Sequence, residues 1–108
     1  MSRSEVPRQV HRRSVSLAAQ CRTQNGLRDQ GEISDLSAQG CCLRVHGLFF
    51  RVGTRVVVRP DGLEGLTGVV RWIEGDYVGV EFDRLIYQPV VDHLIRVHGL
   101  TTVERIVD

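Results

Sequence analysis

The stretch LTGVVRWIEGDYVGVEF, residues 66–82, contains two apolar runs on either side of a short polar segment. In the second run Val78, Val80 and Phe82 share one face, as in a strand with one side buried. The segment between the runs, Glu74-Gly75-Asp76, has the composition of a turn. This stretch therefore predicts a β-hairpin.

The rest of the first 60 residues repeats this pattern of short alternating runs between turn signals. The segment SVSLAAQCR puts Val15, Leu17, Ala19 and Cys21 on one side. We expect further strands around Glu32-Ile33, over residues 41–45 and over residues 55–60, with turns at Asn25-Gly26 and Pro60-Asp61-Gly62. About six short strands with one apolar face each must curl or close to bury it.

The period changes near the C-terminus. QPVVDHLIRVH, residues 88–98, puts Val90, Val91, Leu94 and Ile95 on one helical stripe, and Pro89 suits a first helical turn. The sequence thus predicts an all-β fold, a small six-stranded antiparallel β-barrel over residues 14–97 that includes a C-terminal amphipathic helix. Residues 98–108 are expected to be a tail or a short helix.

Composition limits the possible functions. The 108 residues carry a net charge of +1, so a generally basic nucleic-acid-binding surface is not indicated. All 14 basic residues are arginine, and residues 1–13 form an arginine-rich arm that we expect to be flexible. No apolar run approaches the ~18 residues of a membrane span, and the N-terminus is not a secretory signal.

The three cysteines, Cys21, Cys41 and Cys42, have no metal-binding spacing, and the four histidines are scattered. No metal site is therefore expected. The adjacent pair should alternate on a strand, with Cys41 in the core and Cys42 exposed. Reduced cysteines and the lack of a signal favour a cytoplasmic protein.

Two short motifs could carry a function. Arg8 and Arg12 form an RxxxR in the arm, while Asp35, Ser37 and Gly40 form a DxSxxG. Taken alone, DxSxxG is typical of a plain turn in which Asp and Ser cap amides and Gly adopts a positive φ. RxxxR alone is expected by chance in an arginine-rich chain.

The order of these motifs, together with the run from Gly68 to Trp72 and the later Gly-Val-x-Phe, resembles the PilZ domain over residues 7–97. PilZ domains are receptors for the bacterial second messenger cyclic di-GMP. The resemblance implies a PilZ-like split barrel in which Arg8 and Arg12 hold the ligand from the arm. It also implies that Asp35, Ser37 and Gly40 form the half of the site on the barrel.

The chemistry of these residues agrees with that ligand. An arginine fork matches a phosphate or the O6 and N7 atoms of guanine, and the Asp35 carboxylate can accept from guanine N1–H and N2–H. Ser37 can bond a phosphate or a base edge, or only hold the turn. Gly40 would let a flat base approach the backbone. Trp72 could stack on a guanine or belong to the core, and Arg13 is a further weak candidate.

One position departs from the family pattern. Members often carry another arginine just before RxxxR, where it is associated with a stacked pair of ligands, and here that residue is Pro7. Arg3 or Arg13 could substitute for it. The number of ligands per chain, one or two, is therefore left open.

The sequence favours a receptor over an enzyme, because no nucleophile–base pair or carboxylate pair has supporting context. The resemblance implies that it needs no cofactor and that its ligand is cyclic di-GMP, and we expect ordering of the arm to relay the signal to a downstream effector protein. We expect a monomer or weak homodimer with no membrane and no specific nucleic-acid partner. The alternatives are a small β-barrel module whose arm binds proteins or phosphate backbones, and a degenerate PilZ domain that binds protein only.

Overall fold

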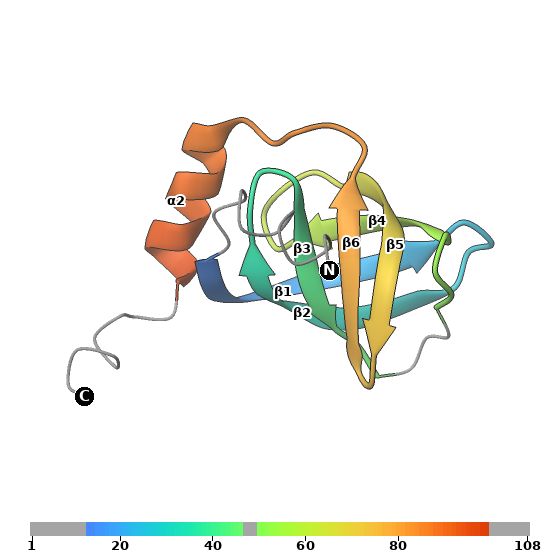
Figure 1. The fold of residues 1–108 in the computed structure, drawn as a ribbon. Coiled ribbons are helices and arrows are strands. Elements are labelled where there is room, and N and C mark those ends of the chain that lie inside the picture. The colour runs from blue at the N-terminus through green and yellow to red at the C-terminus, as the bar shows by residue number, and fades with distance from the viewer. Residues whose placement is uncertain (1–12, 47–49, 100–108) are drawn as a thin grey trace, which may run out of the picture.

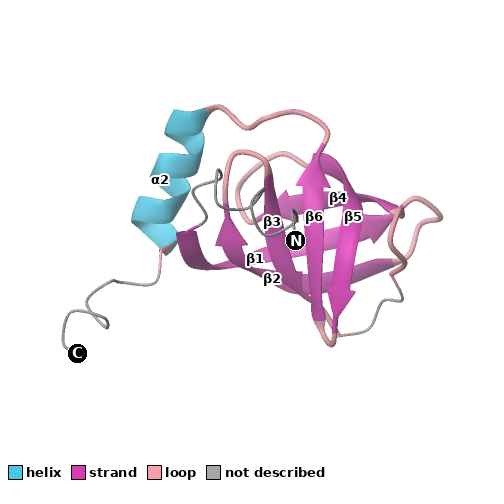
Figure 2. Ribbon diagram, in the orientation of Figure 1, coloured by secondary structure: helices cyan, strands magenta, loops and turns pink. Residues whose placement is uncertain are grey.

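A closed antiparallel β-barrel is formed by the strands of the computed structural model, which describes residues 13–46 and 50–99 (Figures 1 and 2). The fold class predicted from the sequence is confirmed. The strands are β1 (Arg13–Thr23), β2 (Arg28–Leu36), β3 (Gly40–Arg44), β4 (Arg55–Pro60), β5 (Leu66–Glu74) and β6 (Tyr77–Phe82).

The order of strands around the barrel is β1-β2-β3-β6-β5-β4. Pairing of β3 with β6 joins the first three strands to the last three, and pairing of β4 with β1 closes the circle. Closure removes free strand edges, which a single small sheet would otherwise expose.

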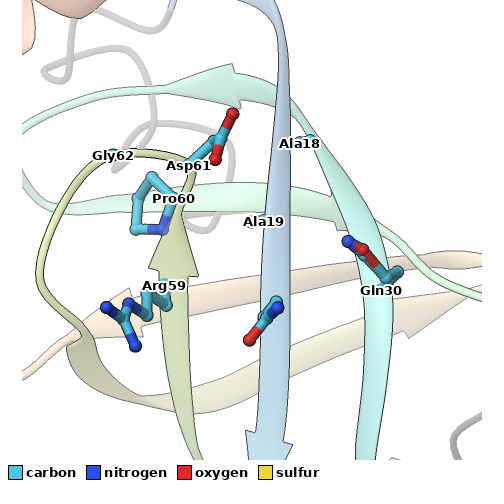
Figure 3. A pocket seen from close by; sticks show the side chains of 8 residues that line it. Ala18, Ala19, Gln30, Arg59, Pro60, Asp61 and Gly62 are labelled. Carbon is cyan, nitrogen blue, oxygen red and sulfur yellow. The ribbon is translucent and has the colours of Figure 1, made fainter.

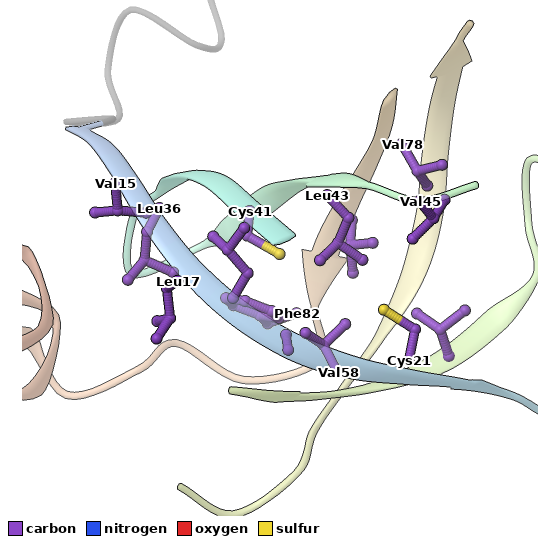
Figure 4. Packing of buried hydrophobic residues seen from close by; sticks show 14 of the residues in the cluster. Val15, Leu17, Cys21, Leu36, Cys41, Leu43, Val45, Val58, Val78 and Phe82 are labelled. Atoms are coloured by element: carbon purple, nitrogen blue, oxygen red, sulfur yellow. The ribbon is translucent and has the colours of Figure 1, made fainter. Parts of the chain in front are cut away.

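The core fills the interior of the barrel (Figure 4). On β1 the inward residues Val15, Leu17, Ala19 and Cys21 are at most 2% exposed, as their alternation predicts. Burying a side chain of valine or leucine size contributes about 1.5–3 kcal/mol. The core contribution of β1 therefore depends on its period-two pattern.

Helix α2 (Gln88–His98) has the predicted bounds and lies at one end of the barrel (Figure 1). Val91 and Leu94 join the core, whereas Val90 is 36% exposed and was wrongly assigned to the buried stripe. Gly99 donates its N–H to Ile95 O at 2.7 Å. Within the part of the chain that is described, no helix is long and apolar enough to cross a membrane.

Strand pairing has three irregularities, one on β1 between Ser14 and Leu17 and two that change which side chains of β2 and β5 face outward. On β2, Ile33 pairs with Leu43 and Asp35 pairs with Cys42, so Ser34 is an extra residue relative to β3. On β5, Val70 pairs with Val80 and Trp72 with Gly79, so Arg71 is likewise extra relative to β6. Bulges of this kind bend a strand and redirect the side chains beside them.

Candidate functional site

Ser37 holds the turn between β2 and β3. Its Oγ accepts the N–H groups of Gln39 at 3.2 Å and Gly40 at 3.3 Å, and its own N–H donates to Gly40 O at 2.9 Å. The residue is only 3% exposed. Of the roles considered for Ser37, holding the turn is therefore the one that these contacts describe.

Gly40 differs from the expectation in two respects. It is not among the described glycines with positive φ, so the left-handed conformation expected for this motif is wrong. A Cβ on Gly40 would lie 2.2 Å from Val80 O on β6, so the space left by the missing side chain faces a neighbouring strand. Close strand pairing is therefore one physical reason for this glycine, whereas its contact with a ligand base stays a prediction.

Asp35 lies on β2, where it pairs with Ser14 of β1 on one side and Cys42 of β3 on the other. The bulge at Ser34 turns it to the outer face of the barrel, while its neighbour Leu36 is fully buried. Asp35 is half-buried, and its Oδ1 is buried from solvent. A carboxylate held this way has a restricted set of directions from which it can accept donors.

Trp72 reaches the same outer face through the bulge at Arg71. The indole lies over Gly79, because a Cβ on Gly79 would be 2.1 Å from Trp72 Nε1. Strand pairing then defines a row across the outer surface that runs Asp35, Cys42, Gly79, Trp72. Three strand spacings separate its ends, about 14 Å.

Cys42 and Gly79 form the middle of this row, and the sequence analysis did not single out either of them. Cys42 is 6% exposed, so the expectation that it would be exposed is wrong although its side of the strand is the outer one. Gly79 leaves the indole room to lie flat. The sequence signal for the middle of this row is Gly79, which interrupts an otherwise alternating strand. Such a glycine often marks a place where another group approaches the backbone closely.

The arm enters the barrel beside Asp35. Arg13, the first residue of β1, pairs with Leu36, and Ser14 pairs with Asp35. Arg13 is exposed. Arg8 and Arg12 lie outside the described residues, so the contacts of the RxxxR side chains remain a prediction.

The turn of DxSxxG is also joined to the segment that leads into α2. Gln39 O accepts the N–H of Phe82 at 2.8 Å, and Ala38 O accepts the N–H of Ile86 at 2.9 Å. At the other end of the helix, Gly99 forms a β-bridge with Val15, next to the start of β1. Both ends of α2 thus contact segments that carry a predicted half of the site.

The chemistry available on this face is that of recognition. A carboxylate can accept paired N–H donors, and the face of an indole can stack on a planar ring. Arg71 beside Trp72 is already paired with Glu81, at 2.6 Å. Within the described residues no cluster of His, Cys, Asp and Glu could hold a metal ion.

Solved structures with a similar fold include three bacterial proteins. The PilZ domain with c-di-GMP of YcgR from Escherichia coli is 13% identical, with a TM-score of 0.64 and coverage of 82% of this chain and 86% of that chain. The PilZ domain of CeSA from a cellulose-synthesizing bacterium is 19% identical, with a TM-score of 0.59 and coverage of 81% and 93%.

The third structure, the Bacillus subtilis inhibitor of motility MotI/DgrA, is 20% identical at a TM-score of 0.56 and matches 82% of this chain but 48% of its own length. No curated protein matches the chain by sequence. The model of the PilZ domain matches residues 7–97, which is most of the chain. This protein therefore belongs to the PilZ domain family.

Proposed function

We propose that this protein is a receptor for cyclic di-GMP, with residues 1–13 acting as an arm that closes on the barrel. The observation that carries the proposal is the register of β1 on β2. The chain that directly follows RxxxR runs beside DxSxxG, since Ser14 and Asp35 are paired. This register supports the proposal that the two motifs, far apart in sequence, act at one surface.

Each residue has a role that suits its chemistry. Arg8 and Arg12 grip phosphates or the O6 and N7 edge of guanine, each charge-assisted bond contributing about 1.5–3 kcal/mol. Asp35 accepts the N1–H and N2–H donors of a guanine. Trp72 stacks on a base, and Arg13 adds positive charge where the arm meets the barrel.

Ser37 and Gly40 serve the ligand indirectly in this proposal. The Ser37 hydroxyl fixes the turn that follows Asp35, and Gly40 lets β3 approach β6 closely. The fold of the YcgR domain, which was solved with c-di-GMP, supports the choice of this nucleotide.

We infer that the output passes through α2 to an effector protein in the cytoplasm. Closure of the arm would change the start of β1, which is bridged to Gly99, while ligand at DxSxxG would bear on Ala38, which is bonded to Ile86. The helix is thus linked at both ends to the binding surface. PilZ domains are ligand-binding receptor domains rather than enzymes, and we propose no catalysis for this chain.

Calorimetric titration of the full chain with cyclic di-GMP, with GTP as the control ligand, tests the proposal. We expect saturable binding of cyclic di-GMP only. Arg8→Ala or Arg12→Ala should abolish it and leave the melting temperature nearly unchanged. Arg96→Ala, on the exposed side of α2, is the matched control and should bind normally.

Normal binding by both arm variants would exclude the arm as a ligand clamp. Binding of many polyanions with a steep dependence on salt would instead favour the alternative of a general phosphate-binding module. No binding by the native chain would favour a degenerate PilZ domain.

Asp35 has its own test because it lies in paired strands. Asp35→Asn keeps the shape of the side chain and replaces one acceptor oxygen with a donor, so guanine N1–H and N2–H lose their joint partner. We expect binding to weaken at least tenfold, about 1.4 kcal/mol or more. A loss of stability with unaltered affinity would assign Asp35 to the fold alone.

A further inference from the structure

A groove follows β1 on the outer face of the barrel, between β2 and β4. Two adjoining hollows, of about 390 and 490 Å³, share Gln20, Gln30 and Arg59 in their walls. Figure 3 shows the first of them, with β1 running between Arg59 on β4 and Gln30 on β2. The groove lies further along β1 than Ser14, where the nucleotide site is proposed.

Three arginines line the second hollow. Arg22 of β1 and Arg28 of β2 are direct partners across the strands, and both are exposed. Arg59 pairs with Gln20, which makes it a diagonal neighbour of Arg22. Like charges placed directly opposite each other destabilise a sheet, so this arrangement opposes folding unless an anion offsets it.

The arginines are available to a ligand. No ion pair within residues 13–46 and 50–99 involves Arg22, Arg28 or Arg59, in contrast to Arg55, which is paired with Asp83. Arg59 Nε donates to Leu63 O at 3.3 Å, which orients this guanidinium and leaves its terminal nitrogens for a ligand.

Two carboxylates line the groove. Asp61 lines the far hollow, near Ala18. Asp29 lines the same hollow as the three arginines, and its Oδ1 accepts the N–H of Gln30 at 2.8 Å. Three arginines against one carboxylate leave a net positive charge at the Arg22 end.

We propose that this groove binds an extended acidic segment of a partner protein. Arg59 lies beside Gln20, which is two residues before Arg22 on β1. The Arg22–Arg28 pair and Arg59 are therefore about 7 Å apart along the strand direction. An extended peptide repeats side chains on one face at the same spacing, so carboxylates at positions i and i+2 would meet the two levels. Aromatic side chains, which stack on bases, do not line these hollows, and this favours a peptide over single-stranded nucleic acid.

The inference goes beyond cyclic di-GMP recognition, because it depends only on this face and holds whether or not the nucleotide binds. Fluorescence anisotropy of the full chain tests it with a labelled peptide, Gly-Ser-Glu-Thr-Glu-Thr-Glu-Ser-Gly. The control peptides carry Gln in place of Glu, or the same three Glu residues in one contiguous block. A labelled nine-nucleotide thymidine oligomer tests the nucleic-acid reading.

The double variant Arg22→Gln/Arg28→Gln should weaken binding of the alternating peptide at least tenfold, and Arg59→Gln should weaken it severalfold. Arg84→Gln/Arg96→Gln removes the same charge elsewhere and should change binding less than twofold. Because the variants at β1 and β2 relieve a like-charge pair, their melting temperatures should equal or exceed that of the native chain.

The contiguous peptide should bind more weakly than the alternating one, and the Gln peptide should not bind. If both double variants lost the same amount of affinity for the alternating peptide, binding would follow net charge alone and the proposal would be overturned. It would also fail if the native chain did not bind the alternating peptide, or if the thymidine oligomer bound more tightly and was lost in the same variants.

Discussion

Gly40 is part of a motif predicted from the sequence to bind a ligand, yet its missing side chain serves the barrel. The carbonyl of Val80 occupies the direction in which a Cβ would point. A glycine kept for close strand pairing looks identical in sequence to one kept for a ligand. The two roles are separated by measuring stability and affinity independently.

Gly40→Ala should therefore destabilise the protein by about 2–3 kcal/mol, because β3 and β6 must move apart. Chemical denaturation measures this free energy of unfolding. The reference variant is Gly26→Ala. Native Gly26 has a φ of 94° and open space around it, so the substitution should destabilise the protein only because alanine disfavours a left-handed backbone, by about 1–2 kcal/mol. A smaller loss at Gly40 than at Gly26 would contradict the close pairing.

Trp72 and Gly79 form a second pair in which a glycine matters for its neighbour. Gly79→Ala would push the indole off the sheet, because the new methyl group would overlap Trp72 Nε1. The protein has one tryptophan, so its emission reports this site alone. We expect the emission maximum to shift to longer wavelength and the stability to fall by about 1–2 kcal/mol.

Gly75→Ala is the matched control on the same hairpin, since nothing lies within 4 Å of its Cβ position. Its φ of 61° makes the change mildly destabilising without touching the indole. Its emission should equal that of the native chain. A shift of equal size in both variants would show that the spectrum follows stability and not the position of the ring.

At the scale of elements, strand identity follows from alternation, and strand pairing does not. Val15 to Cys21 on β1 and the bounds of α2 are readable because burial repeats with a fixed period. Only a brief strand was expected around Ile33, but β2 extends over Arg28–Leu36. Its first residues, 28–31, are held by pairing with β1, which the local sequence does not encode.

The bulges explain most of what remained beyond prediction. An extra residue at Ser34 or Arg71 shifts the pattern by one position, so Trp72 faces outward although simple alternation puts it with Val70. The choice of bulge depends on partner strands distant in sequence. Motif spacing did predict the turn that Ser37 holds, because that turn is local.

A polar cluster at the barrel surface links β4, β5 and the end of β6. Asp83 Oδ2 accepts the hydroxyl of Thr67 at 2.8 Å and also binds Arg55. The Thr67 hydrogen bond, aided by Arg55 and by the charge of Arg84, holds the pKa of Asp83 below its ordinary value despite desolvation. A carboxylate with a lowered pKa stabilises the fold above its unfolded pKa, and this contribution is lost as the pH falls through the folded pKa.

Thr67→Val removes the largest cause of that shift. The variant should have a lower urea midpoint than the native chain at pH 7, and this difference should narrow as the pH falls through the lowered pKa of Asp83 and the carboxylate becomes protonated. Thr54→Val is the control, because its hydroxyl accepts the N–H of Arg51 at 3.2 Å and no carboxylate is involved in that bond. If the difference in urea midpoint between Thr67→Val and the native chain stayed constant with pH, Asp83 would not depend on the Thr67 hydrogen bond.

At the scale of the whole molecule, the absence of lysine simplifies the titration of the chain. All 14 basic side chains are arginine, so no lysine titrates beside the cysteines in alkaline solution. Cys21, Cys41 and Cys42 are all buried, and Cys21 lies in the interior of the closed barrel.

Cys21 should make stability depend on alkaline pH. Burial, with a smaller effect of Asp29, raises the pKa of its thiol to about 12. The unfolded chain ionises this thiol near pH 9, whereas the folded chain keeps it protonated, so stability should fall as the pH rises from about 9 to about 12. The slope for one such thiol is at most about 1.4 kcal/mol per pH unit.

Urea midpoints at pH 8, 9, 10 and 11 should therefore decrease less steeply in Cys21→Ala than in the native chain, although the variant is less stable at pH 8. Tyr87→Phe, at a side chain that is 74% exposed, should leave the slope unchanged. If Cys21→Ala kept the native slope, the thiol would have to be accessible to hydroxide in the folded barrel, and the closure of β1 against β2 and β4 around it would be in error.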